Sequence, residues 1–393
     1  MANSDAVLQP SDADALASML RAANANGQTV VPRGSGTKLA WGPVSTPIDI
    51  VLSTRRLESP MDHRPGDLIA TVPAGATLAA VNELLGRERQ WLTLDPQVSP
   101  DATIGGIVAT NDSGPRRHRY GTPRDLIIGV EMALADGRTA KAGGRVVKNV
   151  AGYDLSRLLC GSFGSLAVMT SATFKLAPLP PASRTVVTAN TNVESLTDIA
   201  LALAAAPLAP SAVEMEGPPY HLAIRYETTE AAAERQAHAT CAICDGFGVG
   251  TETYDSEREG QLWSNLGSRM RDTTGTLVKI SVLPTLVGES LRTIDTLATN
   301  VEVDHVTIGR VALGVLFVRL GGNPQAHPDF VISLRRDVEA KGGSLVVLNG
   351  SDALKRQVDA WGNVGDSLPL MRAVKARFDP SGTLSPGRGP GGI

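Results

Sequence analysis

Three glycine-rich segments lie within the first 170 residues, and they limit what this half of the chain can fold into. They are RGSG at 33–36, TIGGIVATNDSG at 103–114 and GSFGSLAVMT at 161–170. Because glycine has no Cβ, backbone N–H groups in such segments can converge and form a concave site for an anion. Three segments of this kind in one domain predict a ligand that carries a pyrophosphate between two ring systems.

The first segment matches neither of the common phosphate-binding motifs. A dinucleotide-binding fingerprint requires G-x-G-x-x-G between a strand and a helix. Here the glycines stand at 34, 36 and 42, and a second strand is predicted to follow them. The P-loop pattern G-x-x-x-x-G-K-[ST] is also absent. Taken alone, RGSG is typical of a tight turn, so its interpretation as a binding loop depends on the other two segments.

Residue periodicity predicts an α+β fold. Helices are expected at 11–26, with Ser11 as N-cap, and at 76–90; strands are expected at 48–53, 67–75, 165–177 and 310–320; residues 92–122 are expected to be rich in loops. The proline cluster at 177–183 favours a domain boundary. We therefore expect a first domain over 1–180, a second α/β domain over 184–345 and a C-terminal segment over 346–393.

The composition argues against several other classes of protein. A net charge of −3 does not favour binding to nucleic acid. The most apolar run, IALALAAAPLAP at 199–210, is too short to span a bilayer and is broken by prolines. Three cysteines can neither form a disulfide framework nor hold a cysteine-rich iron–sulfur cluster. Two of them, Cys241 and Cys244, have C-x-x-C spacing, which we interpret as two half-buried thiols on a helix.

Four segments, in this order, resemble the FAD-binding family of the vanillyl-alcohol-oxidase type. They are VPRGSGTK, TIGGIVATNDSG, GRVVKNVAGYDLSRLLCGSFGSLAVMT and ARFDPSGTLSPGR. Within that family, SGPRRHRYGTPRDLIIGV and KNVAGYDLSRLLCGSFGSL are most similar to the E subunits of bacterial glycolate oxidase. The resemblance implies a PCMH-type FAD-binding domain of two subdomains, a smaller α/β cap domain, and a C-terminal tail that returns to the FAD domain.

The resemblance also implies a set of FAD-binding residues. The first loop would wrap the pyrophosphate, mostly through backbone N–H groups, with Pro32, Arg33, Gly34, Ser35, Gly36, Thr37 and Lys38. The flavin and diphosphate side would be lined by Thr103, Gly105, Gly106, Asn111, Ser113 and Gly114. Tyr153 and Asp154 would brace the cofactor-binding loop, and Gly164 and Val168 would lie along the adenine end of FAD. Arg388 would bring the C-terminal tail back to the FAD domain. The remaining predicted cofactor-binding residues are Pro96, Ile104 and Gly161.

The same family comparison bears on how the flavin is held. Members that tether the flavin covalently often place a histidine in the first loop, where this chain has Thr37. No histidine lies between residues 1 and 62. We therefore expect non-covalent FAD.

The implied activity is that of an FAD-dependent oxidoreductase acting on CH–OH donors. The chain would be the FAD-binding subunit of a glycolate dehydrogenase complex that oxidises glycolate to glyoxylate. Its partners would be a larger FAD-containing catalytic subunit and an iron–sulfur subunit, with a small hydroxy acid as donor and no nucleic acid. Neither a signal peptide nor a transmembrane segment is recognised, so the expected location is the cytoplasm, or the inner membrane through those partners.

One expected feature is missing from the second half. Related subunits that oxidise 2-hydroxy acids carry an H-x-G-D-G-N-x-H motif, which supplies a base or metal ligands. Residues 300–393 contain only His305 and His327, which do not form this pattern. No metal site is expected, and no catalytic residue can be assigned from the sequence.

Two other functions stay open, as do the roles of several arginines. The chain could be a stand-alone FAD oxidase of another hydroxy acid, sugar or lactone, or a non-catalytic assembly subunit with a vestigial flavin site. The basic stretch 116–119 is either a solvated loop or a site that attracts FAD phosphates, an anionic substrate or an acidic partner. Arg310 and Arg319 either clamp a carboxylate or are solvated at strand ends.

Overall fold

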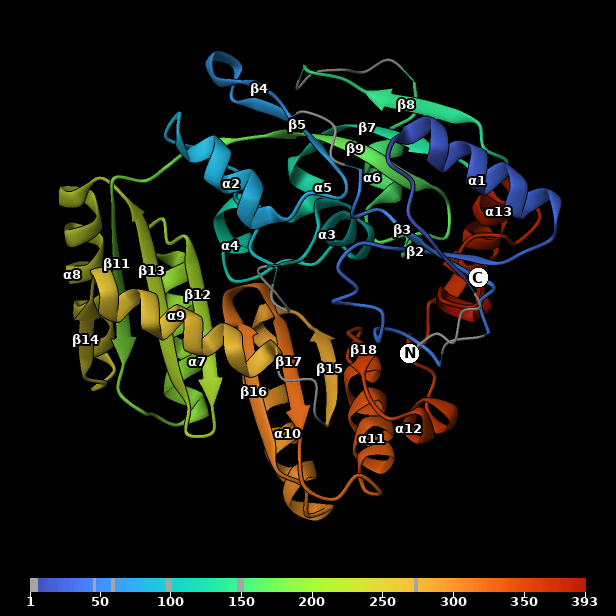
Figure 1. Ribbon diagram of the computed structural model, residues 1–393. Coiled ribbons are helices and arrows are strands. Elements are labelled where there is room, and N and C mark those ends of the chain that lie inside the picture. Colours follow the sequence, from blue (N-terminus) through green and yellow to red (C-terminus); the bar gives the residue numbers. More distant parts are fainter. Residues whose placement is uncertain (1–5, 45–46, 58–60, 97–100, 147–151, 272–274) are drawn as a thin grey trace.

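The computed structural model describes residues 6–44, 47–57, 61–96, 101–146, 152–271 and 275–393. These residues form a mixed α and β structure in which the two halves of the chain lie side by side (Figure 1). The fold class predicted from the sequence is confirmed. Residues 147–151, inside the third family motif, are outside the described part of the chain.

The first half contains a parallel and an antiparallel sheet. The parallel sheet has the strand order β1 (Ala6–Leu8), β3 (Ile50–Ser53), β2 (Val30–Arg33). The antiparallel sheet has the order β4 (Asp62–Arg64), β5 (Ile69–Pro73), β9 (Val168–Lys175), β7 (Ile127–Ala133), β8 (Thr139–Gly143). A short antiparallel pair joins β6 (Gln90–Trp91) to β10 (Ala177–Pro178).

Apart from the short helix at Arg117–Tyr120, which has no buried residue, the helices of the first half pack against these sheets through their apolar faces. They are α1 (Ala13–Ala25), α2 (Leu78–Gly86), α3 (Ile104–Thr110), α4 (Arg117–Tyr120), α5 (Pro123–Leu126) and α6 (Leu155–Leu159). In α1, Leu16 and Leu20 are buried one turn apart. The N-cap of α1 is Asp12, whose carboxylate accepts the Ala15 N–H at 2.8 Å, and not the predicted Ser11.

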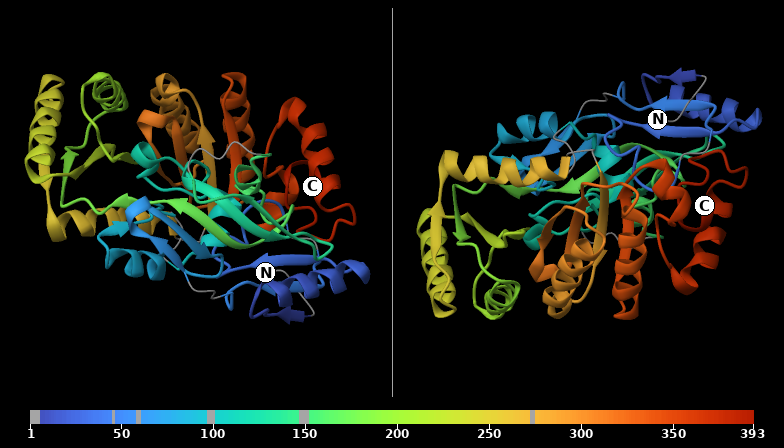
Figure 2. Two further views of the ribbon diagram at one scale, coloured as in Figure 1. Left: turned by 90° about the horizontal axis from the view of Figure 1, so that it is seen from above. Right: turned by 90° about the horizontal axis from the view of Figure 1, so that it is seen from below.

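The second half is built on one antiparallel sheet. Its strand order is β14 (Thr251–Tyr254), β11 (Ala182–Thr188), β13 (His221–Thr228), β12 (Ala212–Gly217), β16 (His305–Arg310), β17 (Val315–Leu320), β15 (Thr276–Ser281), β18 (Ser344–Asn349). One face is covered by α7 (Val193–Ala205), α8 (Glu230–Gly246), α10 (Val287–Asn300) and α11 (His327–Ala340), which enclose the largest apolar core (Figure 2). The other face is turned toward the first half and carries α9 (Ser256–Arg271).

A small apolar cluster joins the two halves across this second face. Trp41 and Phe163 come from the first half, and they pack with Ile308, Phe317 and Leu348 from the eight-stranded sheet. The inner face of the sheet is therefore not an open surface. It is in direct side-chain contact with the loops of the first half.

The C-terminal segment returns to the first half, as the family resemblance implies. After α12 (Asp352–Gln357), α13 (Leu368–Phe378) places the Lys375 ammonium 2.8 Å from the Ser165 carbonyl oxygen. Leu384 then pairs with Val30 of β2 in a parallel bridge. Asp379 fixes this turn, because its buried carboxylate accepts the backbone N–H groups of Thr383 and Leu384.

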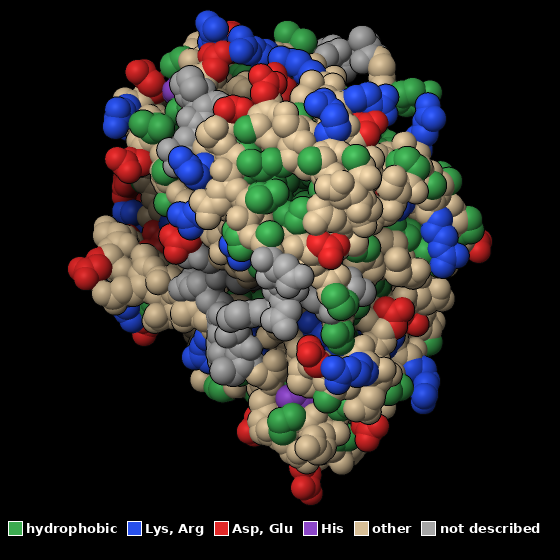
Figure 3. Space-filling view, turned by 45° about the vertical axis from the view of Figure 1, so that its right-hand side comes forward, with side chains coloured by type: hydrophobic (Ala, Val, Ile, Leu, Met, Phe, Trp, Pro, Cys, Tyr) green, Lys and Arg blue, Asp and Glu red, His purple; other side chains and the backbone are tan. Residues whose placement is uncertain are grey.

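Short 3₁₀ segments connect several of these elements. They are Pro65–Asp67, Pro284–Leu286, Val311–Leu313, Gly365–Ser367 and Pro390–Gly392. No described helix is long and apolar enough to cross a membrane. On the face shown in Figure 3, Lys and Arg side chains alternate with Asp and Glu and do not gather into one basic patch.

One secondary-structure prediction was incomplete and another was wrong. Most described residues of 92–122 lie outside helices and strands, as predicted, but the stretch also contains α3 and α4, which were not predicted. The single strand predicted at 310–320 is a hairpin, because the chain turns through Val311–Leu313 and Gly314 adopts a left-handed conformation. The predicted limit of the second domain at 345 falls inside β18.

The hairpin turn at Gly314 gives a test of the fold. Gly314→Ala should lower the free energy of unfolding by about 3 kcal/mol, because the positive φ is strained and an added Cβ would overlap the Val282 carbonyl oxygen. Gly342→Ala is the matched control, since Gly342 also has positive φ but an added Cβ would meet no atom within 4 Å. Strain alone should cost about 1 kcal/mol there. Urea unfolding curves measure both, and equal losses would contradict the assigned turn.

Candidate cofactor-binding site

The first glycine loop lies directly against the start of α3. A Cβ added at Gly34 would overlap the Thr103 hydroxyl, so only glycine permits this approach. Gly36 has positive φ and reverses the chain. Among the described residues, the backbone N–H groups of 34–37 donate no hydrogen bond to the protein. This loop therefore presents a row of amides that are available to an anion.

The second glycine segment supplies the opposite wall as a helix. Thr103 is the N-cap of α3, and its hydroxyl accepts the Gly106 N–H at 3.3 Å. Gly105 lies against Ala74, and its N–H donates to the Ala74 carbonyl oxygen at 2.9 Å. The amides of Gly105 and Gly106 are thus already bonded within the protein. Their contribution is a wall without side chains, and the free amides belong to the first loop.

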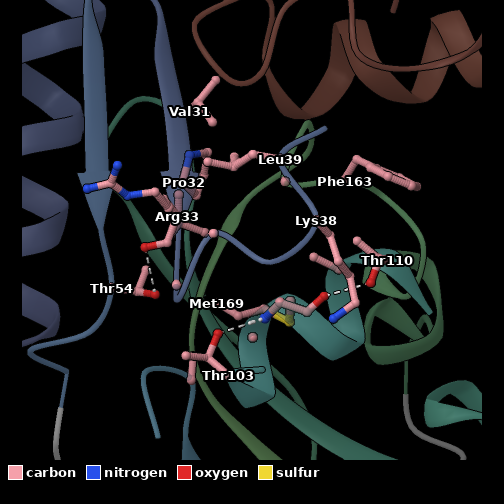
Figure 4. Close-up of a pocket in the computed structure, with 18 of the residues that line it drawn as sticks. Val31, Pro32, Arg33, Lys38, Leu39, Thr54, Thr103, Thr110, Phe163 and Met169 are labelled. Carbon is pink, nitrogen blue, oxygen red and sulfur yellow. Dashed lines mark hydrogen bonds between the residues drawn. The ribbon is translucent and has the colours of Figure 1, made fainter. Parts of the chain in front are cut away.

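These walls enclose a cavity of about 730 Å³, part of which is open to solvent. Figure 4 shows Thr103 and Thr110 at the two ends of α3, together with Pro32 and Arg33 at the end of β2 and Lys38 and Leu39 on the loop that follows it. The predicted residues that line the cavity are Pro32, Arg33, Gly34, Ser35, Gly36, Thr37, Lys38, Thr103, Gly105, Gly106, Gly164, Val168 and Arg388. Three segments far apart in sequence and the tail therefore meet at one place.

The charges around the cavity favour an anionic ligand. Its lining includes Arg33, Lys38 and Arg388 but no acidic residue. Burial lowers the pKa of Arg388, and its Nε is buried without a hydrogen-bond acceptor among the described residues. An unsatisfied buried donor is costly, so this guanidinium is suited to a ligand oxygen.

Lys38 is held by a buried partner just behind the cavity. Its ammonium lies 3.2 Å from the Asp112 carboxylate, and the two side chains are 5% and 2% exposed. A buried ion pair of this kind positions charge more than it stabilises the fold. Asp112 follows α3 directly, so the second glycine segment also fixes where the Lys38 charge lies.

Eight predicted residues do not line this cavity. Ile104 is in the core and Pro96 lines a different cavity, between the halves. Asn111 caps the C-terminus of α3, Ser113 accepts a hydrogen bond from Arg117, Gly114 donates to Asp95, and Gly161 donates to Val108. Asp154 is the N-cap of α6, and Tyr153 is 91% exposed. These residues shape or cap the neighbouring loops.

Further lining residues were not anticipated from the sequence. They are Val31, Leu39, Thr54, Ala74, Ala109, Thr110, Phe163, Ala167 and Met169. Most of these side chains are small or apolar, so nothing in the sequence marks them as residues of a binding site. Ala109 and Thr110 follow Gly105 and Gly106 by four residues, so the helical period would have found them once α3 was recognised.

The basic stretch 116–119 connects the two halves and does not line the cavity. The Arg116 guanidinium donates three hydrogen bonds to the Glu227 carboxylate of β13, at 2.8, 3.1 and 3.2 Å, and stacks on the Trp91 ring at 4.7 Å. Arg119 donates to the Glu227 carbonyl oxygen at 3.2 Å. Arg116 and Arg119 therefore attach α4 to the second half. Their presence needs neither a solvated basic loop nor a site for an anionic ligand or partner to explain it.

A second polar cavity, of about 630 Å³ with part open to solvent, lies between the halves. Arg116 and Arg225 line it, and each is paired with a carboxylate, Arg225 with Glu259 at 2.9 Å. Behind it, fully buried Arg310 lies 3.4 Å from Glu214. Arg310 is therefore neither solvated nor open to a ligand. The two arginines that line this cavity, and Arg310 behind it, are thus all paired with protein carboxylates.

Two carboxyl groups in that region have raised pKa values. Burial raises the pKa of Glu214 to about 7, although the Arg310 charge opposes it. Desolvation likewise raises the pKa of Asp95 to about 6, against the pull of Arg116. Because the folded-state pKa of Glu214 exceeds its ordinary value of 4.5, its contribution to stability is complete below pH 4.5. That contribution is lost as pH rises through about 7.

The cysteines show no sign of reactivity. Cys241 and Cys244 lie on α8, and burial raises the pKa of Cys244 to about 11 and that of Cys160 to about 12. Thiols with raised pKa are poor nucleophiles and poor metal ligands. Within the described ranges, no group of three or more His, Cys, Asp or Glu side chains is placed to hold a metal ion.

The residues present fit a dinucleotide such as FAD. The free amides of the first loop and Arg388 suit a pyrophosphate, and the apolar walls suit flat rings. Family models agree with this geometry. The "FAD binding domain" model matches residues 4–143, and the "FAD linked oxidases, C-terminal domain" model matches residues 182–388, more than half of the chain.

Curated relatives are named as oxidases or dehydrogenases of hydroxy acids. Glycolate oxidase subunit GlcD of Bacillus subtilis is 27% identical over 98% of this chain and 88% of its own length. D-lactate dehydrogenase of Archaeoglobus fulgidus is 29% identical over 97% of this chain and 90% of its own length. Glycolate oxidase subunit GlcE of Escherichia coli is 37% identical, but over 39% of this chain and 44% of its own length.

A solved structure shares the fold. An alkyldihydroxyacetonephosphate synthase superposes with a TM-score of 0.74 over 97% of this chain and 76% of that one. The two sequences are 14% identical, so the likeness concerns the fold alone.

Gly106 tests the position of the cavity. An added Cβ would contact only the Thr103 hydroxyl, at 3.2 Å, so the side chain of Gly106→Leu would extend into the cavity. We expect loss of at least nine-tenths of the bound flavin, on the order of 1.4 kcal/mol of binding, with little change in the thermal midpoint of the apoprotein. Gly86→Leu is the control, because an added Cβ there meets no atom within 4 Å. Flavin absorbance per protein is the readout; full retention in Gly106→Leu would mean that the site is misplaced.

The buried pair Glu214–Arg310 gives a second test. Either Glu214→Leu or Arg310→Met leaves an uncompensated buried group and should cost about 3–5 kcal/mol of unfolding free energy. The double variant should recover most of that loss, because well-packed apolar side chains can replace a buried ion pair. Urea unfolding of the three variants forms the cycle. Additive losses in the double variant would show that the pair is not coupled.

Proposed function

Because this chain belongs to the family of FAD-linked oxidases, we propose that it is the FAD-binding subunit of a complex that oxidises glycolate to glyoxylate. The coarser activity is that of an FAD-dependent oxidoreductase acting on CH–OH donors. Similarity to subunits named GlcD and GlcE supports the glycolate complex. Full-length similarity to a D-lactate dehydrogenase supports the wider class of 2-hydroxy acids.

The observation that carries the subunit role is the segment RVALGVLF, residues 310–317. It has the length of the H-x-G-D-G-N-x-H motif of related hydroxy-acid-oxidising subunits, with Arg310 and Phe317 at the two histidine positions and Gly314 in place. The guanidinium of Arg310 offers only hydrogen-bond donors and is stacked on the Phe317 ring at 4.7 Å. Neither residue can accept the hydroxyl proton of a donor. We therefore assign hydroxy-acid oxidation to a larger FAD-containing partner subunit and onward transfer to an iron–sulfur partner.

The cofactor site supports a flavin held without a covalent bond. Bound FAD supplies reversible two-electron acceptor chemistry. The chain would hold it through the amides of 34–37 and the Arg388 guanidinium, while Ala109, Phe163 and Met169 exclude water. Among the described residues that line the cavity there is no histidine, cysteine or tyrosine to form a tether. On this proposal the complex works in the cytoplasm, or at the inner membrane through its other subunits.

A stand-alone oxidase is the second candidate. Its support is the 97% coverage of this chain by the D-lactate dehydrogenase match, which spans both halves. Against it stands the pairing of Arg116 and Arg225, which line the cavity between the halves, and of Arg310 behind it, since none of these three is left to clamp a substrate carboxylate. An assembly subunit with a vestigial flavin site is the third candidate, and the open amides of the first loop argue against it.

Acid precipitation tests the mode of flavin attachment. The purified chain should be yellow, and trichloroacetic acid should release the colour into the supernatant, because non-covalent contacts are lost when the protein unfolds. Supernatant absorbance is the measurement. Colour that remains in the pellet would overturn the non-covalent assignment, and a colourless protein that cannot be reconstituted with FAD would favour the vestigial-site alternative.

Anaerobic reduction tests the subunit role. Glycolate should not bleach the flavin of the isolated chain, whereas dithionite should, because the chain offers no proton acceptor at 310–317. Co-expression with a larger FAD homologue and a cysteine-rich partner should give glycolate-dependent bleaching of this flavin. Bleaching of the isolated chain by glycolate or D-lactate would instead establish the stand-alone oxidase.

A further inference from the structure

Lys279 occupies the inner face of the eight-stranded sheet. It pairs with Phe317 of β17 and Val346 of β18. Its neighbours Val278 and Ile280 belong to the helix-covered core. Because side chains alternate along a strand, Lys279 points the other way, toward the first half of the chain.

Two further cations lie close to Lys279. Arg310 is on β16 with its guanidinium over the Phe317 ring, and Arg117 comes from α4 in the first half. Desolvation, followed by the charges of Arg117 and Arg310, lowers the pKa of Lys279 to about 8, while Asp112 opposes the shift. Like charges held together in this way favour an anion between or beside them.

The carboxylates nearby are largely committed. Asp112 pairs with Lys38, Glu214 with Arg310, and Asp95 accepts the backbone N–H groups of Gly114 and Arg116. The Lys279 ammonium itself makes no hydrogen bond or ion pair of 4.0 Å or less with another described residue. Its charge is therefore available to a ligand.

The same residues connect Lys279 to the cofactor cavity. The charge of Asp112 raises the pKa of Lys279, and Asp112 is also the ion-pair partner of Lys38, which lines the cavity. Phe317, the cross-strand neighbour of Lys279, belongs to the apolar cluster that Phe163 joins, and Phe163 also lines the cavity. Lys279 thus lies on the side of the cavity that faces the second half.

This side is the one that suits the redox ring of FAD. The adenosine end can be enclosed within the first half, but the ring must be reachable by a donor or partner, and cofactor sites commonly open at domain interfaces. We propose that Lys279, with Arg310 and Arg117 beside it, is the cation that stabilises negative charge on the reduced flavin ring. It acts as a tuning residue for the bound cofactor. The inference rests on FAD binding and not on the identity of the donor.

Reduction potential and sulfite binding measure this charge directly. Sulfite adds to the oxidised ring and leaves negative charge on it, so it reports a nearby cation without any substrate. Lys279→Met should weaken sulfite binding at least tenfold and lower the two-electron midpoint potential of bound FAD by about 30 mV, the equivalent of a tenfold change. Lys279→Arg keeps the charge and should stay close to the native protein in both measurements.

A matched control and a second variant secure the test. Lys341→Met removes the lysine that directly follows α11, on the opposite side of the sheet, where Lys341 pairs with Asp337 and Glu289, and should change neither value. If Lys279→Met does not retain FAD, Lys279→Gln is compared with Lys279→Arg.

Equal potentials and equal sulfite affinities in charged and neutral variants that hold FAD would overturn the proposal. All measurements use the isolated chain loaded with FAD. Their outcome therefore does not depend on whether this flavin receives electrons from a partner subunit or directly from a hydroxy acid. If the proposed subunit role proves wrong, the Lys279 result still stands.

Discussion

The close contact between Gly34 and the Thr103 hydroxyl is the constraint on which the rest of the cofactor site depends. It brings the loop after β2 onto the start of α3, and no side chain can stand between them. The amides of 34–37 then stay free of partners among the described residues while Thr103 caps the helix. The Leu384–Val30 bridge brings the tail, and with it Arg388, to the same cavity.

The second half closes over this site through two kinds of contact. An apolar cluster that includes Trp41, Phe317 and Leu348 fills the inner face of the sheet, and the Arg116–Glu227 pair attaches α4 at its edge. A packed face of this kind is in direct contact with the first half and is not an open surface. It also places fixed charge, chiefly that of Arg310 and Lys279, where a mobile proton acceptor would otherwise be expected.

If the chain has the proposed subunit role, this arrangement explains how a family fold can keep its cofactor while its task changes. The hairpin that carries RVALGVLF keeps its glycine turn, because a side chain at Gly314 would meet the Val282 carbonyl oxygen. The residues at its two ends are under no such backbone constraint. The Arg310 guanidinium stacks on the Phe317 ring and forms an ion pair with the Glu214 carboxylate. Fold and flavin site can thus be retained while proton-transfer groups are absent from this hairpin.

The sequence by itself determined the α+β class, the FAD site through its ordered glycine segments, and the loss of the histidine motif, because each depends on residues close together in the chain. It did not reveal α3, because the first turn of Ile104–Thr110 contains two glycines, and glycine is a poor helix former. This helix is stabilised instead by its Thr103 cap and by packing on Ala74. Nor could it find Phe163, Lys279 or the pairing of Arg116 with Glu227. Those depend on contacts between residues far apart in the chain, 111 positions in the case of Arg116 and Glu227, and only the tertiary structure decides which apolar or charged side chains meet there.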